Sequence, residues 1–150
     1  MAWLAGGMAM ARERRCELLA VAPPAELVAL ADRCLDYEGA SLDIRSGPTV
    51  GTVALEVREP VMGERFILGD VLLTTVEVEW RGKRSWAGLL GRDRAAALAA
   101  AVCDAEAEAG GPLAREVEKL CLTTGHAAEE AACREESELA RTVVQFEELL

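Results

Sequence analysis

Histidine occurs only once in this sequence of 150 residues, at His126, and this scarcity limits the metal chemistry that the chain can support. A site built from several histidines is excluded. Cys121, His126 and Cys133 could supply three ligands together with a nearby glutamate, but their spacing matches no common zinc pattern. We therefore predict no metal site, and we interpret His126 as a surface residue near the start of a helix.

Glycine loops that bind nucleotides are also missing. The glycines between Gly63 and Gly91 follow neither the G-x-G-x-x-G nor the G-x-x-x-x-G-K-[ST] spacing, and no parallel β-α-β unit surrounds them. Some of these glycines have acidic neighbours, at Glu64, Asp70 and Asp93. General acid–base catalysis needs two carboxylates in one cleft, and these positions do not indicate such a cleft. The residues alone therefore predict no catalytic group.

Cysteine pairing motifs are absent as well. The five cysteines are odd in number, are widely spaced and contain no C-x-x-C, which excludes a disulfide framework and a zinc ribbon. Nothing in their sequence context marks one of them as an activated nucleophile. We expect free and mostly buried thiols in a reducing cytoplasm, at Cys16, Cys34, Cys103, Cys121 and Cys133.

Positive charge is scarce, because 16 basic residues against 26 acidic ones give a net charge of −10. This balance argues against nucleic-acid binding, which requires a positively charged surface. The basic residues concentrate between Arg81 and Arg94, where five of them accompany a single acid, Asp93. That segment is either a solvated hairpin turn and helix start or a local site for an anion or an acidic partner.

Long apolar runs are absent too. The beginning, MAWLAGGMAMARERR, differs from a signal peptide because its charges follow the apolar run, and that run is too short to span a membrane. We expect residues 1–11 to be a disordered extension. Residues 1–150 are expected to form one domain of a cytoplasmic protein without membrane contact.

Apolar residues at helical spacing predict two short helices near the N-terminus, at 11–21 and 24–35. The three arginines of the first helix are expected on its exposed side. A period of two then replaces the helical period. It predicts a short extended piece at 42–45, a turn at Gly47–Pro48 and a half-buried strand with Val53, Leu55 and Val57 on one face.

The middle of the chain predicts a β-hairpin. A long strand is expected at 66–80, with a bulge or a break at Gly69. The RGKR turn at 81–84 leads into a partner strand at 85–90. Neighbouring strands joined by a short turn run antiparallel, so the sheet is expected to be antiparallel.

The last part of the chain predicts helices again. An alanine-rich helix follows Gly91, with Asp93 placed to accept its free N–H groups, and Gly110–Pro112 ends it. A short helix and then a last helix at about 125–150 complete the chain. The fold class is therefore α+β: a central antiparallel sheet at about 41–90, flanked by N-terminal helices and C-terminal helices.

The stretches GERFILGD and GRD combine glycines with acids, and we interpret them mainly as scaffold. Their glycines serve turns and their acids serve caps and loops. Phe66 and Leu68 are expected in the core. The structural motif consists of Gly63, Gly69, Asp70, Gly91 and Asp93.

The order of several stretches is informative in itself. RERRCELLAVAPPAEL and PTVGTVALEVREPV come first. They are followed by GERFILGDVLLT, a hairpin, GRD and an alanine-rich helix, and the series closes with Thr142-x-Val144-x-Phe146. This order resembles the PhnG family, a subunit of bacterial carbon–phosphorus lyase. The chain departs from the family pattern at Gln145, where aspartate is frequent, at Glu147, in the missing basic tail and in a shorter RGKR hairpin.

The resemblance implies an assembly that degrades alkylphosphonates. Subunits of types G, H, I and J form its core, and ATP-binding-cassette-type subunits join them. With its partners, the G subunit is required to displace adenine from ATP by a phosphonate, giving an α-D-ribose 1-alkylphosphonate 5-triphosphate. The nucleosidase activity is attributed to the I subunit, and the radical step, with an iron–sulfur cluster and S-adenosylmethionine, to the J subunit. The resemblance thus implies that this chain binds no cofactor and lacks a complete active site.

The sequence leaves two functions open. In the first, the chain is a structural and activity-supporting subunit whose C-terminal helix at 125–150 docks on a partner, most directly an I-type subunit, or associates with itself through the complex. An internal core role for that helix is the alternative. In the second, the chain is an independent anion-binding protein or enzyme that uses the segment Arg81–Arg94. Candidate contacts for a partner's acids or for a triphosphate are Arg65, Arg92 and Arg94.

Overall fold

A computed structural model describes residues 10–37, 39 and 41–141. It confirms the predicted α+β class, with a three-stranded antiparallel sheet and four helices in this part of the chain. In chain order the elements are α1 (Arg12–Val21), α2 (Pro24–Leu35), β1 (Leu42–Arg58), β2 (Arg65–Trp80), β3 (Lys83–Leu90), α3 (Arg94–Glu108) and α4 (Ala114–Ala140).

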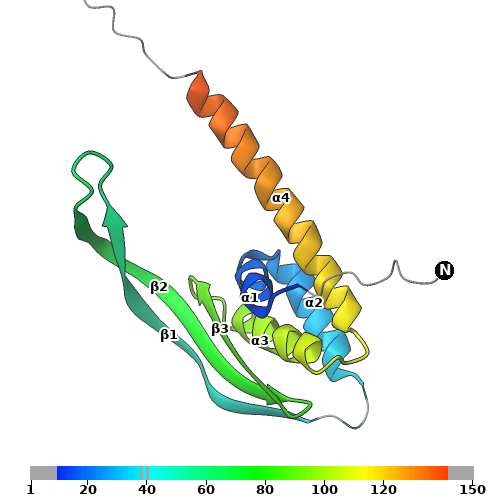
Figure 1. Ribbon diagram of the computed structural model, residues 1–150. Helices are drawn as coiled ribbons and strands as arrows, with labels where there is room; N and C mark the ends of the chain where they lie inside the picture. The colour runs from blue at the N-terminus through cyan, green and yellow to red at the C-terminus, as the bar shows by residue number, and fades with distance from the viewer. Residues whose placement is uncertain (1–9, 38, 40, 142–150) are drawn as a thin grey trace, which may run out of the picture.

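The sheet has the order β1-β2-β3. β3 pairs with the second half of β2 only, from Trp80↔Lys83 to Leu73↔Leu90. β1 and β2 continue to pair beyond that point as far as Arg58↔Arg65. The two long strands therefore extend past the rest of the domain as a hairpin arm, residues 52–72, which Figure 1 shows on the side away from the helices.

The predicted turn at Gly47–Pro48 is wrong, because β1 passes through it as one strand with local register shifts. Pro48 has no N–H for a ladder, but an edge strand can tolerate that loss at a bulge. Gly47 has a φ of 79°, and a Cβ at this position would lie 2.5 Å from the carbonyl oxygen of Thr75. Only glycine fits there without strain.

The predicted irregularity at Gly69 is confirmed as a bulge. Leu55 pairs with Gly69 but Glu56 pairs with Ile67, which leaves Leu68 as the extra residue of β2. The predicted hairpin turn is confirmed too. Arg81 and Gly82 both have positive φ values, 49° and 72°, as a two-residue type I′ turn requires.

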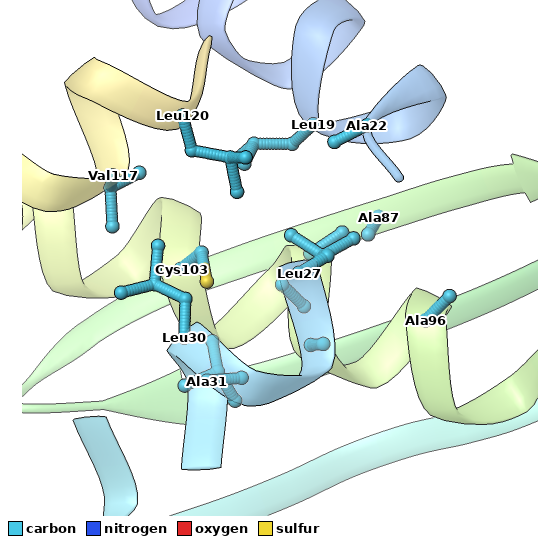
Figure 2. Close-up of a cluster of buried hydrophobic side chains, with 14 of the residues drawn as sticks. Leu19, Ala22, Leu27, Leu30, Ala31, Ala87, Ala96, Cys103, Val117 and Leu120 are labelled. Atoms are coloured by element: carbon cyan, nitrogen blue, oxygen red, sulfur yellow. The ribbon is translucent and has the colours of Figure 1, made fainter. Parts of the chain in front are cut away.

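All four helices lie on one side of the sheet (Figure 1). α3 packs directly on β2 and β3, and the other helices pack around α3. Its alanine-rich sequence allows this close approach, since Ala97, Ala101 and Val102 are completely buried. Figure 2 shows how side chains from α1, α2, α3 and α4 meet over the same region, among them Leu19, Leu27 and Leu120. The domain therefore has one core, between the sheet and the helices.

The last helix begins earlier than predicted. The two helices expected after Gly110–Pro112 are one continuous helix, α4. Gly125 does not interrupt it, because this residue is buried against α1, where a Cβ would lie 3.6 Å from Leu18 Cδ2. His126 is consequently exposed in the middle of a helix and not near its start. The second half of α4, from residue 126 to residue 140, is exposed, and the predicted continuation at 142–150 lies outside the described residues.

Candidate functional site

The three candidate arginines do not form one site. Arg65 lies in the hairpin arm, where its guanidinium is 3.3 Å from Glu56 and exposed to solvent. Arg92 and Arg94 are exposed at the start of α3, just after the end of β3. From Arg65 to the level of Leu73, where β3 ends, is roughly 25 Å of extended strand. A single anion cannot contact both regions.

The remainder of the basic segment is partly committed to the core. The Arg81 guanidinium lies 2.7 Å from the buried carboxylate of Glu106 and 5.1 Å from the centroid of the Trp80 ring. Arg84 lies 3.6 Å from Glu79 on the neighbouring strand. Within this segment, Arg81 and Arg84 thus pair with different acids, one buried and one on the neighbouring strand.

The residues of the structural motif make local contacts. The Asp93 carboxylate accepts from the Ala96 N–H at 2.9 Å and caps α3. Gly91 has a φ of 100°, and its N–H donates to the Leu72 carbonyl at 2.9 Å. Gly63, at a φ of 71°, belongs to the turn at the tip of the arm. Asp70 is exposed on the arm.

A buried ionic cluster on α1 and α3 was missed by the sequence analysis. Arg15 was expected on the exposed side of the first helix, but it is buried, with its guanidinium 2.8 Å from Asp104 and 2.6 Å from Glu108. Arg12 and Ser85 also donate to Asp104, at 2.7 and 2.8 Å. Burial alone would raise the pKa of Asp104, but the hydrogen bonds from Arg12, Ser85 and Arg15 outweigh it and hold the pKa below its ordinary value.

A second buried carboxylate holds the turn between α3 and α4. Glu106 accepts from Trp80 Nε1 at 2.7 Å, from Arg81 Nε at 2.7 Å and from the Leu113 N–H at 3.1 Å. Burial would raise the pKa of Glu106, but these three donors lower it. Asp104 and Glu106 thus have hydrogen-bond donors within the chain and stabilise the fold. Their positions in an otherwise apolar, alanine-rich helix are the feature of the sequence that could have indicated buried acids.

The thiols are mostly buried, as predicted. Cys34, Cys103 and Cys121 are buried, Cys16 is half-buried and Cys133 is exposed, and all are free. Burial raises the pKa of Cys121 to about 11, so its thiolate is disfavoured at neutral pH. Among the residues that the structure describes, no group of three histidine, cysteine or acidic side chains is placed to hold a metal ion.

The most prominent surface feature is the uncovered side of the sheet. Val76, Val78 and Trp80 point toward the helices and are buried. The residues that alternate with these three along β2, together with their partners on β1 and β3, lie on the opposite side of the sheet, which we call the outer face. Opposite β3 the outer face carries Glu77 and Glu79, and its apolar residues are Val53, Leu55, Val57, Phe66, Val71, Leu73, Trp86 and Leu90.

The outer face corrects two predictions. The strand with Val53 and Leu55 was expected to be half-buried, and Phe66 and Leu68 were expected in the core. Phe66 is 47% exposed because it lies on the outer face, opposite the helices, and Leu68 is 63% exposed at the bulge of the arm, beyond the reach of the helices. Periodicity identifies an apolar face but does not say whether this chain covers it.

The size of this apolar surface points to an interaction site. Trp86 and Leu90 extend the outer face onto β3, at 58% and 74% exposure, and Val61 and Met62 are exposed in the turn at the tip of the arm. Monomeric proteins rarely expose large contiguous apolar patches, and those that do usually bind another protein or a membrane there. The arrangement is suited to binding and offers no catalytic constellation among the described residues.

None of the helices in the described part of the chain is both long and apolar enough to cross a membrane. A comparison with curated proteins finds no match. The family model described as phosphonate metabolism protein PhnG matches residues 10–150, nearly the whole chain. The chain therefore belongs to the PhnG family of phosphonate metabolism proteins.

Proposed function

We propose that this protein is a subunit of a cytoplasmic carbon–phosphorus lyase complex that degrades alkylphosphonates. With partner subunits it is required to form an α-D-ribose 1-alkylphosphonate 5-triphosphate from ATP and a phosphonate. Its own contribution is mainly structural. ATP is a substrate of the assembly, and the iron–sulfur cluster and S-adenosylmethionine belong to a partner. The partners are the H-, I- and J-type subunits, with the I-type as the most direct one.

The observation that supports this proposal is the outer face of the sheet. The uncovered face of an antiparallel sheet is ordinarily polar. Here it carries exposed apolar residues, and all four helices described lie on the other side (Figure 1). The buried acids Asp104 and Glu106 have their donors within the chain, so they support folding and not chemistry. Apolar docking surface without a catalytic cluster is the expected design of an activity-supporting subunit.

The exposed arginines have a place in this proposal. Arg92 and Arg94 at the start of α3, and Arg65 on the arm, contact acidic groups of partner subunits or the triphosphate at a shared site. Because Arg65 is distant from the other two, it serves a different contact. An independent anion-binding protein, the alternative, would need the basic side chains to converge on one point, and Arg81 instead pairs with Glu106.

Reconstitution tests the proposal. The H-, I- and J-type proteins of the same organism are mixed with ATP and methylphosphonate, with and without this chain, and the release of adenine is measured. We expect adenine and the ribosyl triphosphate only when this chain is present. Equal release without it would show that the chain is not required.

A further inference from the structure

The two edge strands of the sheet, β1 and β3, differ in the features that keep their free edges from pairing with other chains. β1 carries Pro48 and several charged side chains, and register shifts interrupt its pairing. These are the features by which proteins prevent edge strands from pairing with other chains. In β3, the stretch Trp86–Leu90 reads Trp-Ala-Gly-Leu-Leu and contains neither a charge nor a proline. This edge of the sheet has no such protection.

The hydrogen bonds define which backbone groups face this edge. The Gly91 N–H donates to the Leu72 carbonyl of β2, whereas the Arg84 carbonyl accepts from the Arg12 guanidinium of α1, at 2.7 Å. In an antiparallel pair the direction alternates along the strand. Trp86 and Gly88 therefore direct their N–H and C=O groups away from β2. Within residues 10–37, 39 and 41–141, no strand pairs with that side of β3.

A cavity of about 330 Å³ adjoins the same stretch. Leu19 of α1, Ala87 of β3 and Ala100 of α3 give it an apolar lining, beside which Cys16 and Asp104 also border the cavity. Glu13 and Glu17 line its α1 side. The small side chain of Ala87 leaves room above the strand. A strand added beside β3 would direct the side chain opposite Ala87 to the helix side of the sheet, into this cavity.

We propose that the edge of β3 from Trp86 to Leu90, together with this cavity, binds an extended segment of a partner subunit by β-strand addition. The segment inserts one large apolar side chain into the cavity. It carries a lysine or an arginine next to that position, which meets the exposed carboxylates of Glu13 and Glu17. The added strand is short, because the Arg84 carbonyl already accepts a hydrogen bond from Arg12 and pairing ends there. This inference rests on the proposed function only in taking the partner from the same complex.

A second copy of this chain is a poorer occupant. The side chains of β3 that face the helices are Ser85, Ala87 and Leu89, and all three are buried within their own domain. A second β3 along this edge would therefore have no side chain for the cavity. It would also bring Glu13 and Glu17 of two chains together, with a net charge of −10 on each chain.

A matched pair of variants tests the cavity. Ala20 is half-buried and lines it, so Ala20→Phe fills the cavity from α1. Val21→Phe places the same ring at the next, exposed position outside the cavity. Each variant is titrated against the co-purified partner subunits. We expect Ala20→Phe to weaken binding at least about tenfold, as the loss of a hot-spot pocket does, and Val21→Phe to bind as the unmodified chain. Equal affinity of the two variants would overturn the inference.

Hydrogen–deuterium exchange of the unmodified chain tests the edge, with peptides that cover residues 86–90, alone and in the complex. We expect the Trp86 and Gly88 amides to exchange at least about tenfold more slowly in the complex, whereas the Ala87 and Leu89 amides are already slow in the chain alone. A complex that leaves the Trp86 and Gly88 amides fast would overturn this inference and leave the proposed function intact. Protection in an isolated dimer would assign the edge to a second copy. Failure of the unmodified chain to bind any partner would remove both proposals.

Discussion

Asp104→Asn removes one partner of the buried ion pair between α1 and α3. The change keeps the shape of the side chain but removes the negative charge that faces the buried Arg15 guanidinium at 2.8 Å. Breaking a buried ion pair costs about 3–5 kcal/mol, because the remaining charge is left without compensation in a poorly hydrated site. Glu108 still contacts Arg15, at 2.6 Å, so we expect the lower end, about 3 kcal/mol.

Urea unfolding followed by far-ultraviolet circular dichroism measures this loss of unfolding free energy. Glu17→Gln is the matched control, since it removes the pair between Arg14 and Glu17, at 3.1 Å on the exposed side of α1. Exposed ion pairs contribute little, so the control should unfold as the unmodified chain does. A loss below about 1 kcal/mol for Asp104→Asn would refute the view that this cluster stabilises the domain.

The unmodified chain and Asp104→Asn also differ in how their stability depends on pH. The folded-state pKa of Asp104 is depressed, so its contribution is fully present above the ordinary aspartate pKa of about 3.9 and is lost as the pH falls through the lower folded-state value. The stability difference between the unmodified chain and Asp104→Asn should therefore be constant from pH 7 to about pH 5 and shrink below about pH 4. A difference that grows on acidification would contradict the assigned direction of the shift.

Four further substitutions follow from the same structure. Leu27→Ala should lower the unfolding free energy by about 2–5 kcal/mol in urea, because Leu27 is completely buried in the core; a loss near zero would contradict that packing. Gly47→Ala should lower the thermal midpoint, since this position has a positive φ and no room for a Cβ beside Thr75; an unchanged midpoint would show that β1 can rearrange there. Phe66→Asp should reduce aggregation of the isolated chain in light scattering and weaken partner binding, because it places a charge on the outer face; unchanged binding would exclude Phe66 from the interface. Arg92→Ala should reduce adenine release by the reconstituted subunits, and full activity with intact assembly would remove Arg92 as a contact.

Local sequence patterns were sufficient to predict much of the fold. The boundaries of α2, the Asp93 cap, the Arg81–Gly82 turn and the bulge at Gly69 all follow from rules that act within a few residues. The continuity of β1 through Gly47–Pro48 depends instead on the neighbouring strand, because the backbone of Thr75 leaves no room for a Cβ at position 47. Such contacts lie far apart in the sequence and cannot be identified from one segment.

Burial was harder to predict than secondary structure, for a related reason. Arg15 reads as a surface residue of a short basic helix, and its burial requires Asp104, which lies on a different helix. Phe66 was expected in the core and Leu55 on the buried side of its strand because both are apolar, and both are exposed because they lie on the face opposite the helices. The candidate contacts Arg65, Arg92 and Arg94 remain predictions, and the structure adds that Arg65 lies apart from the other two.

Co-purification shows whether the outer face is an interface with partner subunits. The tagged chain is expressed with the H-, I- and J-type proteins of the same organism, and the eluate is analysed by size exclusion with light scattering. We expect a stable complex of high mass that contains the I-type subunit, and we expect Phe66→Asp to disrupt this complex. A monodisperse monomer that binds none of these partners would contradict the account and direct attention to the segment Arg81–Arg94 as a ligand site.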